Sequence, residues 1–165
     1  MAGIAGLTLG FRADANKRVS KFTVMVKSTG TASTQQAQYA KIPAAANAAG
    51  ILGVTVDHFI EPGGLYFVPQ GTDPSTVTGT TPTSYSLAGR IITLQVNGVA
   101  RCYCAAAVAQ GDVLVVADAY GRVFNLASAA ITGGTVYYAV GIAQHGTSAI
   151  NDVVQVHLGF YQGVA

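Results

Sequence analysis

Charged side chains are scarce in this sequence. Only 10% of its 165 residues are Asp, Glu, Lys or Arg, against a usual share of about 25%. Half of the residues are hydrophobic. A solitary cytosolic enzyme normally carries more charge to keep it soluble. Because low charge is better tolerated where neighbours cover the surface, the composition favours a protein that works inside an assembly.

Long apolar runs and cysteines are also few. No apolar run approaches the ~18 residues of a membrane span, so no membrane partner is expected. The N-terminal MAGIAGLTLGF lacks a basic region and a cleavage site, and we expect it to be retained. Cys102 and Cys104 would project from one face of a strand, which suits neither a mutual disulfide nor, without matching histidines, a zinc site. Reduced thiols and a cytoplasmic place of folding are expected.

Motifs that carry chemistry are absent as well. The sequence has no phosphate-binding GxxxxGK[ST], no GxGxxG after a strand and no GxSxG. His58, His145 and His157 are scattered. Acidic residues are too few to indicate a catalytic pair, although Asp57 and Glu61 are close in sequence. We therefore predict a protein that is not an enzyme and has no cofactor and no metal.

The few charges are unevenly distributed. Residues 1–50 hold six basic side chains and one acidic side chain, a balance of +5, whereas residues 51–165 hold three basic and six acidic, a balance of −3. A basic N-terminal third indicates an acidic partner, or simply a solvated basic face. Nucleic acid is not expected as the partner, because the basic residues are not interleaved with aromatic residues for stacking.

The main positive signal is a series of short β-strands. They are rich in Val, Ile, Thr and Tyr, are separated by Gly, Asn and Asp, and are spaced as in all-β folds. The runs are 21–27, 53–59, 90–98, 99–105, 112–118, 137–144 and 152–160.

Three features between these runs carry further expectations. Asn97-Gly98 predicts a type I′ hairpin between its flanking runs. In GDVLVVADAYGRV, the Asp118 carboxylate and Gly121 fit a tight reversal better than a calcium loop, because no glutamate follows and Arg122 stands where a ligand would be needed. The alanine-rich segments 43–50 and 126–134 are each expected to form a turn or two of helix at most.

The strands form a weak internal repeat. FTVMV, QYAKI and ILGVTVDH align with VLVVA, GRVFN and YAVGIAQH, which places Gly53 opposite Gly141. The repeat covers 21–58 and 111–159, and residues 59–89 are a long inserted loop in the first copy. Two similar halves are expected to close around one core, as a single β domain over 21–165. Residues 1–20 are interpreted as an N-terminal arm, although an edge strand would also fit.

The second half of the sequence resembles the capsid decoration, or cement, proteins of tailed bacteriophages. Their pattern appears here as Gly111-Asp112-Val113, the residues from Asp118 to Val123, the strand from Val140 to Ala143 and the strand from Val153 to Leu158. The match covers about 104–159, and 20–58 through the repeat. The resemblance implies a small all-β, barrel-like domain of the β-tulip kind, usually trimeric. It also implies a place on the outer surface of the virion capsid.

The resemblance implies a structural role without chemistry. The protein would bind the major capsid protein and cement neighbouring shell subunits around the packaged DNA, many copies acting together. We expect shell or subunit contacts in the N-terminal segment and the inserted loop, at Leu7, Leu9, Phe11, Arg12, Lys17, Arg18, Tyr66 and Phe67. The alternatives are another virion β-protein of the tail, head fibre or baseplate, or a module that binds host glycans.

Overall fold

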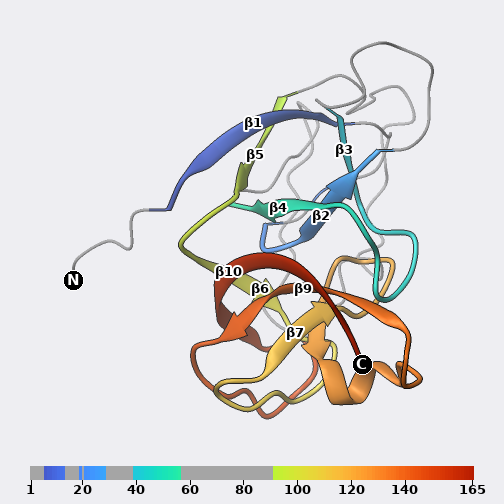
Figure 1. The fold of residues 1–165 in the computed structure, drawn as a ribbon. Helices are drawn as coiled ribbons and strands as arrows, with labels where there is room; N and C mark the ends of the chain where they lie inside the picture. The colour runs from blue at the N-terminus through green and yellow to red at the C-terminus, as the bar shows by residue number, and fades with distance from the viewer. Residues whose placement is uncertain (1–5, 14–18, 20, 29–38, 57–90) are drawn as a thin grey trace, which may run out of the picture.

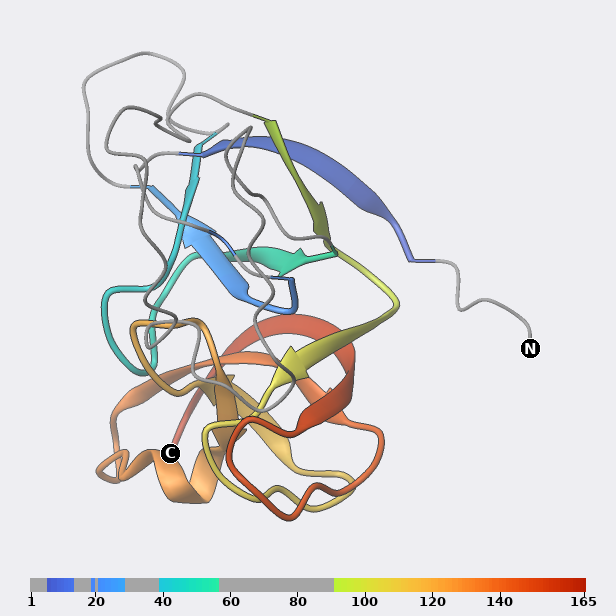
Figure 2. The same ribbon diagram turned by 180° about the vertical axis from the view of Figure 1, so that it is seen from behind.

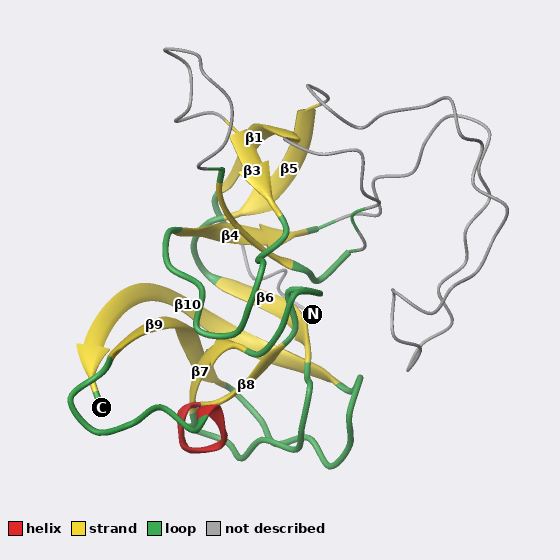
Figure 3. Ribbon diagram, turned by 90° about the vertical axis from the view of Figure 1, so that its right-hand side faces the viewer, coloured by secondary structure: helices red, strands yellow, loops and turns green. Residues whose placement is uncertain are grey.

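A computed structural model of the chain describes residues 6–13, 19, 21–28, 39–56 and 91–165. Over these residues the protein is all-β (Figure 3), and its one helix in this part is a short 3-10 turn. The predicted all-β fold is confirmed. None of the helical residues in the described part is in a segment long and apolar enough to cross a membrane.

The ten strands of the described residues form two five-stranded units. The first unit is a closed barrel in the order β1-β3-β2-β4-β5. Its strands are β1 (Thr8–Ala13), β2 (Val24–Lys27), β3 (Tyr39–Lys41), β4 (Ile51–Thr55) and β5 (Ile91–Gln95). The second unit is a sheet in the order β6-β10-β9-β7-β8. It contains β6 (Val99–Tyr103), β7 (Val113–Val116), β8 (Val123–Asn125), the 3-10 helix η2 (Leu126–Ala129), β9 (Val136–Ala143) and β10 (Val153–Val164). Figure 1 shows the barrel above the second sheet.

The two units share one topology. Because the barrel is closed, its order can be written starting from β3, as β3-β2-β4-β5-β1. This order matches β8-β7-β9-β10-β6 in the sheet. The barrel closes through the parallel pairing of Ala13 with Ala40. The sheet carries a parallel bridge at the corresponding place, between Cys104 and Val123. The repeat is therefore wider than the sequence indicated, because β1 and β6 also belong to it.

Backbone hydrogen bonds fix the register of the repeat. Phe22 N donates to Thr55 O at 2.8 Å, and Gly111 N donates to Ala143 O at 2.9 Å. Phe22 and Gly111 both have positive φ, at 64° and 87°. The correspondence is thus Phe22 with Gly111, which differs by two residues from the sequence alignment of FTVMV with VLVVA. The alignment was wrong by one pleat of the strand, because alternating Val and Met residues look alike at a shift of two.

The equivalence of Gly53 and Gly141 is confirmed. Gly53 is paired with Met25 and Gly141 with Leu114, and in both cases the register shifts at the next residue pair. A Cβ on Gly53 would lie 2.6 Å from Gln95 O, and one on Gly141 would clash with His157 O. In both units, a neighbouring backbone approaches the bulge so closely that only glycine fits.

The described residues form two buried clusters. One lies within the barrel and includes Met25, Ile92 and Leu94. The other fills the second unit, yet it also includes Val24 and Val54 from β2 and β4 of the barrel. Since these two valines alternate with the inward-facing Met25 and Gly53, they project from the outer face of the barrel and join the units.

The first part of the expected N-terminal arm is a strand of the barrel. β1 pairs with β5 from Thr8 to Arg12 and with β3 at Arg12 and Ala13. These residues are therefore not a free arm. The pairing with β3, which closes the barrel, is confined to the end of β1. The rest of the interpreted arm, 1–5, 14–18 and 20, lies outside the described residues, as does the insertion 59–89.

The predicted hairpin at Asn97-Gly98 is wrong. β5 pairs with β1 and β4, while β6 pairs with β10, and Figure 2 shows the chain passing from β5 in the barrel to β6 in the sheet. Gly98 has a φ of 85°, but Asn97 keeps a negative φ, so the two residues do not form a type I′ turn. The turn instead links the two units. Of the two alanine-rich segments, 126–129 forms η2 and 43–50 forms no helix.

Candidate functional site

The Asp118 reversal is present as predicted. The Asp118 carboxylate accepts hydrogen bonds from Tyr120 N at 2.9 Å and, more weakly, from Arg122 N at 3.4 Å. Gly121 supplies a φ of 73°, and its N donates to Asp118 O at 3.2 Å. An Asx-type turn therefore reverses the chain between β7 and β8.

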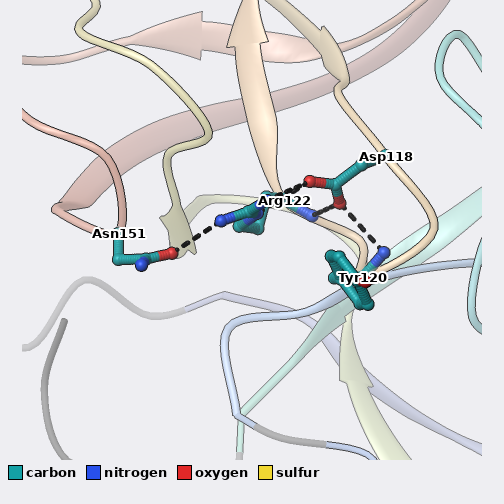
Figure 4. A network of polar contacts seen from close by, with 4 residues as sticks. All are labelled: Asp118, Tyr120, Arg122 and Asn151. Atoms are coloured by element: carbon teal, nitrogen blue, oxygen red, sulfur yellow. Dashed lines mark hydrogen bonds and ion pairs between the residues drawn. The ribbon is translucent and has the colours of Figure 1, made fainter. Parts of the chain in front are cut away.

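Sequence reasoning missed the role of Arg122. Its Nε and Nη2 atoms both lie 2.7 Å from Asp118 Oδ2, and its Nη1 donates to Asn151 Oδ1 at 2.8 Å (Figure 4). Arg122 is 9% exposed, and its guanidinium lies 5.4 Å from the Tyr120 ring. Asn151 has a φ of 66° at the turn before β10. The network fastens the β7–β8 turn to the segment before β10, so its polar atoms are engaged in holding the fold.

The two thiols lie in the interior. Cys102 on β6 and Cys104 just beyond it are free, and both are fully buried in one cluster. Burial, and next the neighbouring Cys104, raise the pKa of Cys102; burial also raises the pKa of Cys104. A protonated thiol is a poor nucleophile and a poor metal ligand.

Histidine and acidic side chains do not gather in the described part of the chain, where no three His, Cys, Asp or Glu residues could hold a metal ion. His145 is exposed, and its Nε2 accepts a hydrogen bond from Gln155 N at 3.2 Å. His157 is exposed on β10. His58, Asp57 and Glu61 lie outside the described residues.

Four of the eight expected contact residues lie on the first unit. Leu7 and Leu9 are 58% and 45% exposed, and Phe11 is half-buried against the barrel cluster. Arg12 is exposed and paired with Ile91, which is 70% exposed. Ile91 was not expected, because a run of alternating strand residues does not show which side has no cover. Lys17, Arg18, Tyr66 and Phe67 lie outside the described residues.

The charge asymmetry along the sequence corresponds to a difference in charge between the described residues of the two units. Every charged residue described in the first unit is basic: Arg12, Lys21, Lys27 and Lys41. The described residues of the second unit hold two arginines and three aspartates. The exposed Arg12 and Ile91 thus form a basic and apolar patch on the outer face of β1 and β5, which we call the β1–β5 face.

A groove lies between the units, beside the C-terminal half of β10. Its volume is about 390 Å³, and it is lined by Gly50, Ile51, Tyr138, Ala139, Phe160, Tyr161 and Gln162. Asn47, in the loop between β3 and β4, joins the units here: its Oδ1 accepts from Tyr138 N at 2.9 Å, and its Nδ2 donates to Val136 O at 2.9 Å. Figures 1 and 2 both show this loop next to β9.

The groove gathers aromatic side chains from two strands. Tyr138 comes from β9, and Phe160 and Tyr161 come from β10. Tyr137 packs edge-to-face on Tyr161, with 6.3 Å between the ring centroids. Adjacent residues of one strand face opposite ways, so Tyr137 and Tyr138 by themselves would not form an aromatic face. The neighbouring strand β10 completes the group with Phe160 and Tyr161.

No protein-family model and no curated protein matches this chain.

Proposed function

We propose that this protein is a capsid decoration protein of a tailed bacteriophage, which binds the outer surface of the shell and cements neighbouring subunits. The observation that carries the proposal is the β1–β5 face. There the aliphatic Ile91, 70% exposed, lies opposite the exposed Arg12, on a unit whose described charges are all basic.

Such a face suits an acidic partner surface. Exposed apolar area favours burial in a contact, and basic charge adds long-range attraction and orientation. A hydrogen-bonded barrel provides a rigid base for the contact, because β1 and β5 are paired along their length. Many weak contacts of this kind on one shell would act through avidity. The site described above is structural, which agrees with a protein that works by binding.

The test is binding to heads assembled from the major capsid protein of the phage that encodes this chain. Ile91→Asp and Arg12→Glu are expected to lower occupancy on the heads at least tenfold together. Ile150→Asp is the matched control, since Ile150 is also exposed, at 56%, but lies in the second unit. Wild-type occupancy by the Ile91→Asp, Arg12→Glu variant would refute the role of this face, and absence of wild-type binding would refute the proposed function. Deleting residues 1–16 is unsuitable, because it removes the barrel strand β1.

A second candidate function is supported by the aromatic groove. Sugar rings stack on aromatic side chains, and polar groups then fix their orientation; a groove of this size with few polar groups is typical of a small-molecule site. The described lining has no charged residue, so it would suit a neutral saccharide of a host surface. Tyr161→Ala is expected to abolish a signal on a glycan array. A wild-type protein that binds no glycan on such an array would remove this candidate.

A further inference from the structure

The two units use different, non-equivalent faces where they contact each other. The first unit contributes the outer face of β2 and β4, with Val24 and Val54. The second unit contributes Ala100 on β6, in the same buried cluster, and the turn at Gly121, whose O accepts from Val24 N at 2.9 Å. The contact is therefore heterologous: the outer face of one unit covers the inner face of the next.

Because the units are repeats, the second unit has an outer face equivalent to the one that the first unit uses in this contact. The first unit likewise has an inner face equivalent to the one that the second unit uses. The register above makes Ile142 the counterpart of Val54, since Thr55 corresponds to Ala143. Leu9 is the counterpart of Ala100: Leu9 pairs with Leu94 on β5, and Ala100 pairs with Val156 on β10. Within the described part of the chain, these counterparts have no partner unit.

Their exposure differs sharply from that of the residues they match. Val54 is 1% exposed, while Ile142 is 41% exposed. Ala100 is 3% exposed, while Leu9 is 45% exposed, and Leu7 beside it is 58% exposed. Each of the two faces that meet inside the chain thus has an exposed equivalent on the other unit. Each exposed equivalent carries a large aliphatic side chain, Ile142 or Leu9.

We propose that a second copy of this chain covers them, with the Ile142 face of one copy packed on the Leu9 face of the next. This contact would repeat between chains the packing that Val54 and Ala100 take part in within the chain. Such a head-to-tail contact continues from copy to copy, and it gives a ring where the rotation closes and an open filament where it does not. The inference concerns the isolated protein and does not depend on binding to a capsid.

Cross-linking between two variants, each with one added cysteine, tests the geometry. Leu9→Cys and Ile142→Cys are prepared separately; the native Cys102 and Cys104 are fully buried and stay unmodified. A short thiol cross-linker is expected to give covalent dimers when the two variants are mixed, and none with either variant alone. Covalent dimers of Leu9→Cys alone would overturn the proposal, because they require two identical faces to meet. A mixture without dimers would overturn it too.

The native mass provides a second measurement. Sedimentation of the wild-type chain is expected to give an oligomer, which Ile142→Asp and Leu9→Asp each reduce to a single chain. Ile150→Asp, at a position that is 56% exposed in the turn before β10, is expected to leave the mass unchanged. Circular dichroism identifies any variant that has not folded. A monomeric wild type would refute the proposed contact between copies. It would not affect the proposed role of the β1–β5 face, which is tested by binding to heads.

Discussion

Replacing Asp118 by alanine tests whether the Asp118–Arg122–Asn151 network stabilises the fold. The substitution removes both contacts at 2.7 Å to the Arg122 side chain and the bond to Tyr120 N at 2.9 Å. It leaves a guanidinium that is 9% exposed with Asn151 as its remaining side-chain partner in the network. A buried charge without its counter-ion is among the largest single sources of instability.

The expected loss is about 3 kcal/mol in the free energy of unfolding, the low end for breaking a buried ion pair. The low end applies because the Asp118 side chain is 22% exposed and that of Arg122 is 10% exposed, so water partly compensates. This loss corresponds to a fall of about 1 to 2 M in the urea midpoint. The effect should change little with salt, since the pair is mostly buried.

Urea unfolding followed by circular dichroism measures the loss; the sequence has eight tyrosines and no tryptophan, so tyrosine fluorescence is the second probe. In a double-mutant cycle, Asp118→Ala with Arg122→Met should cost about 2 kcal/mol less than the sum of the single losses. Asp112→Ala is the control. Asp112 also caps a turn, accepting from Ala109 N at 2.8 Å, but lies at the other end of β7. Its loss should add to that of Arg122→Met.

A loss below about 0.5 kcal/mol for Asp118→Ala would place the pair with exposed ion pairs and refute the reasoning. Strict additivity of Asp118→Ala and Arg122→Met would do the same.

Two further results are expected. Gly53→Ala and Gly141→Ala should each lower the free energy of unfolding, measured in urea, by about 2–3 kcal/mol, because the added Cβ meets a backbone carbonyl oxygen. Gly133→Ala is the control: open space surrounds this position, and the free energy should change by less than about 0.5 kcal/mol. Equal losses at all three positions would contradict the close approach. Stability should also fall as the pH rises above 9.0, the ordinary pKa of the thiol. Above that pH the unfolded chain loses the Cys102 proton, while burial keeps the proton on Cys102 in the folded chain. If the Cys102→Ala variant shows the same slope of stability against pH as the wild type, this explanation is wrong.

Much of the fold could be predicted from local patterns. All seven predicted strand runs contain a strand, because alternating Val, Ile and Tyr residues specify a half-buried strand wherever the strand finds its partners. The Asp118 reversal was also predictable, since its hydrogen bonds join residues at most four positions apart. The equivalence of Gly53 and Gly141 was visible for a similar reason: a glycine inside a strand marks a bulge or a close approach.

Strand pairing was less accessible. The Asn97-Gly98 signal describes a turn, but whether the flanking strands pair depends on which neighbours each one meets, and β5 and β6 both meet others. The place of β1 in the barrel was hidden for the same reason, because its partners β3 and β5 are far along the chain. Similarly, the aromatic groove needs Tyr138 from one strand and Phe160 and Tyr161 from another.

The sequence alone determined the strands, the tight reversal and the existence of a repeat, since these follow from side-chain periodicity and short-range hydrogen bonds. Tertiary structure decided the closure of the barrel, the partners of Arg122 and the faces that each unit covers or leaves bare. Val54 and Ile142 occupy equivalent positions with similar side chains, yet one is 1% exposed and the other 41%. Burial is a property of what lies opposite a residue, and the residue's own strand does not carry that information.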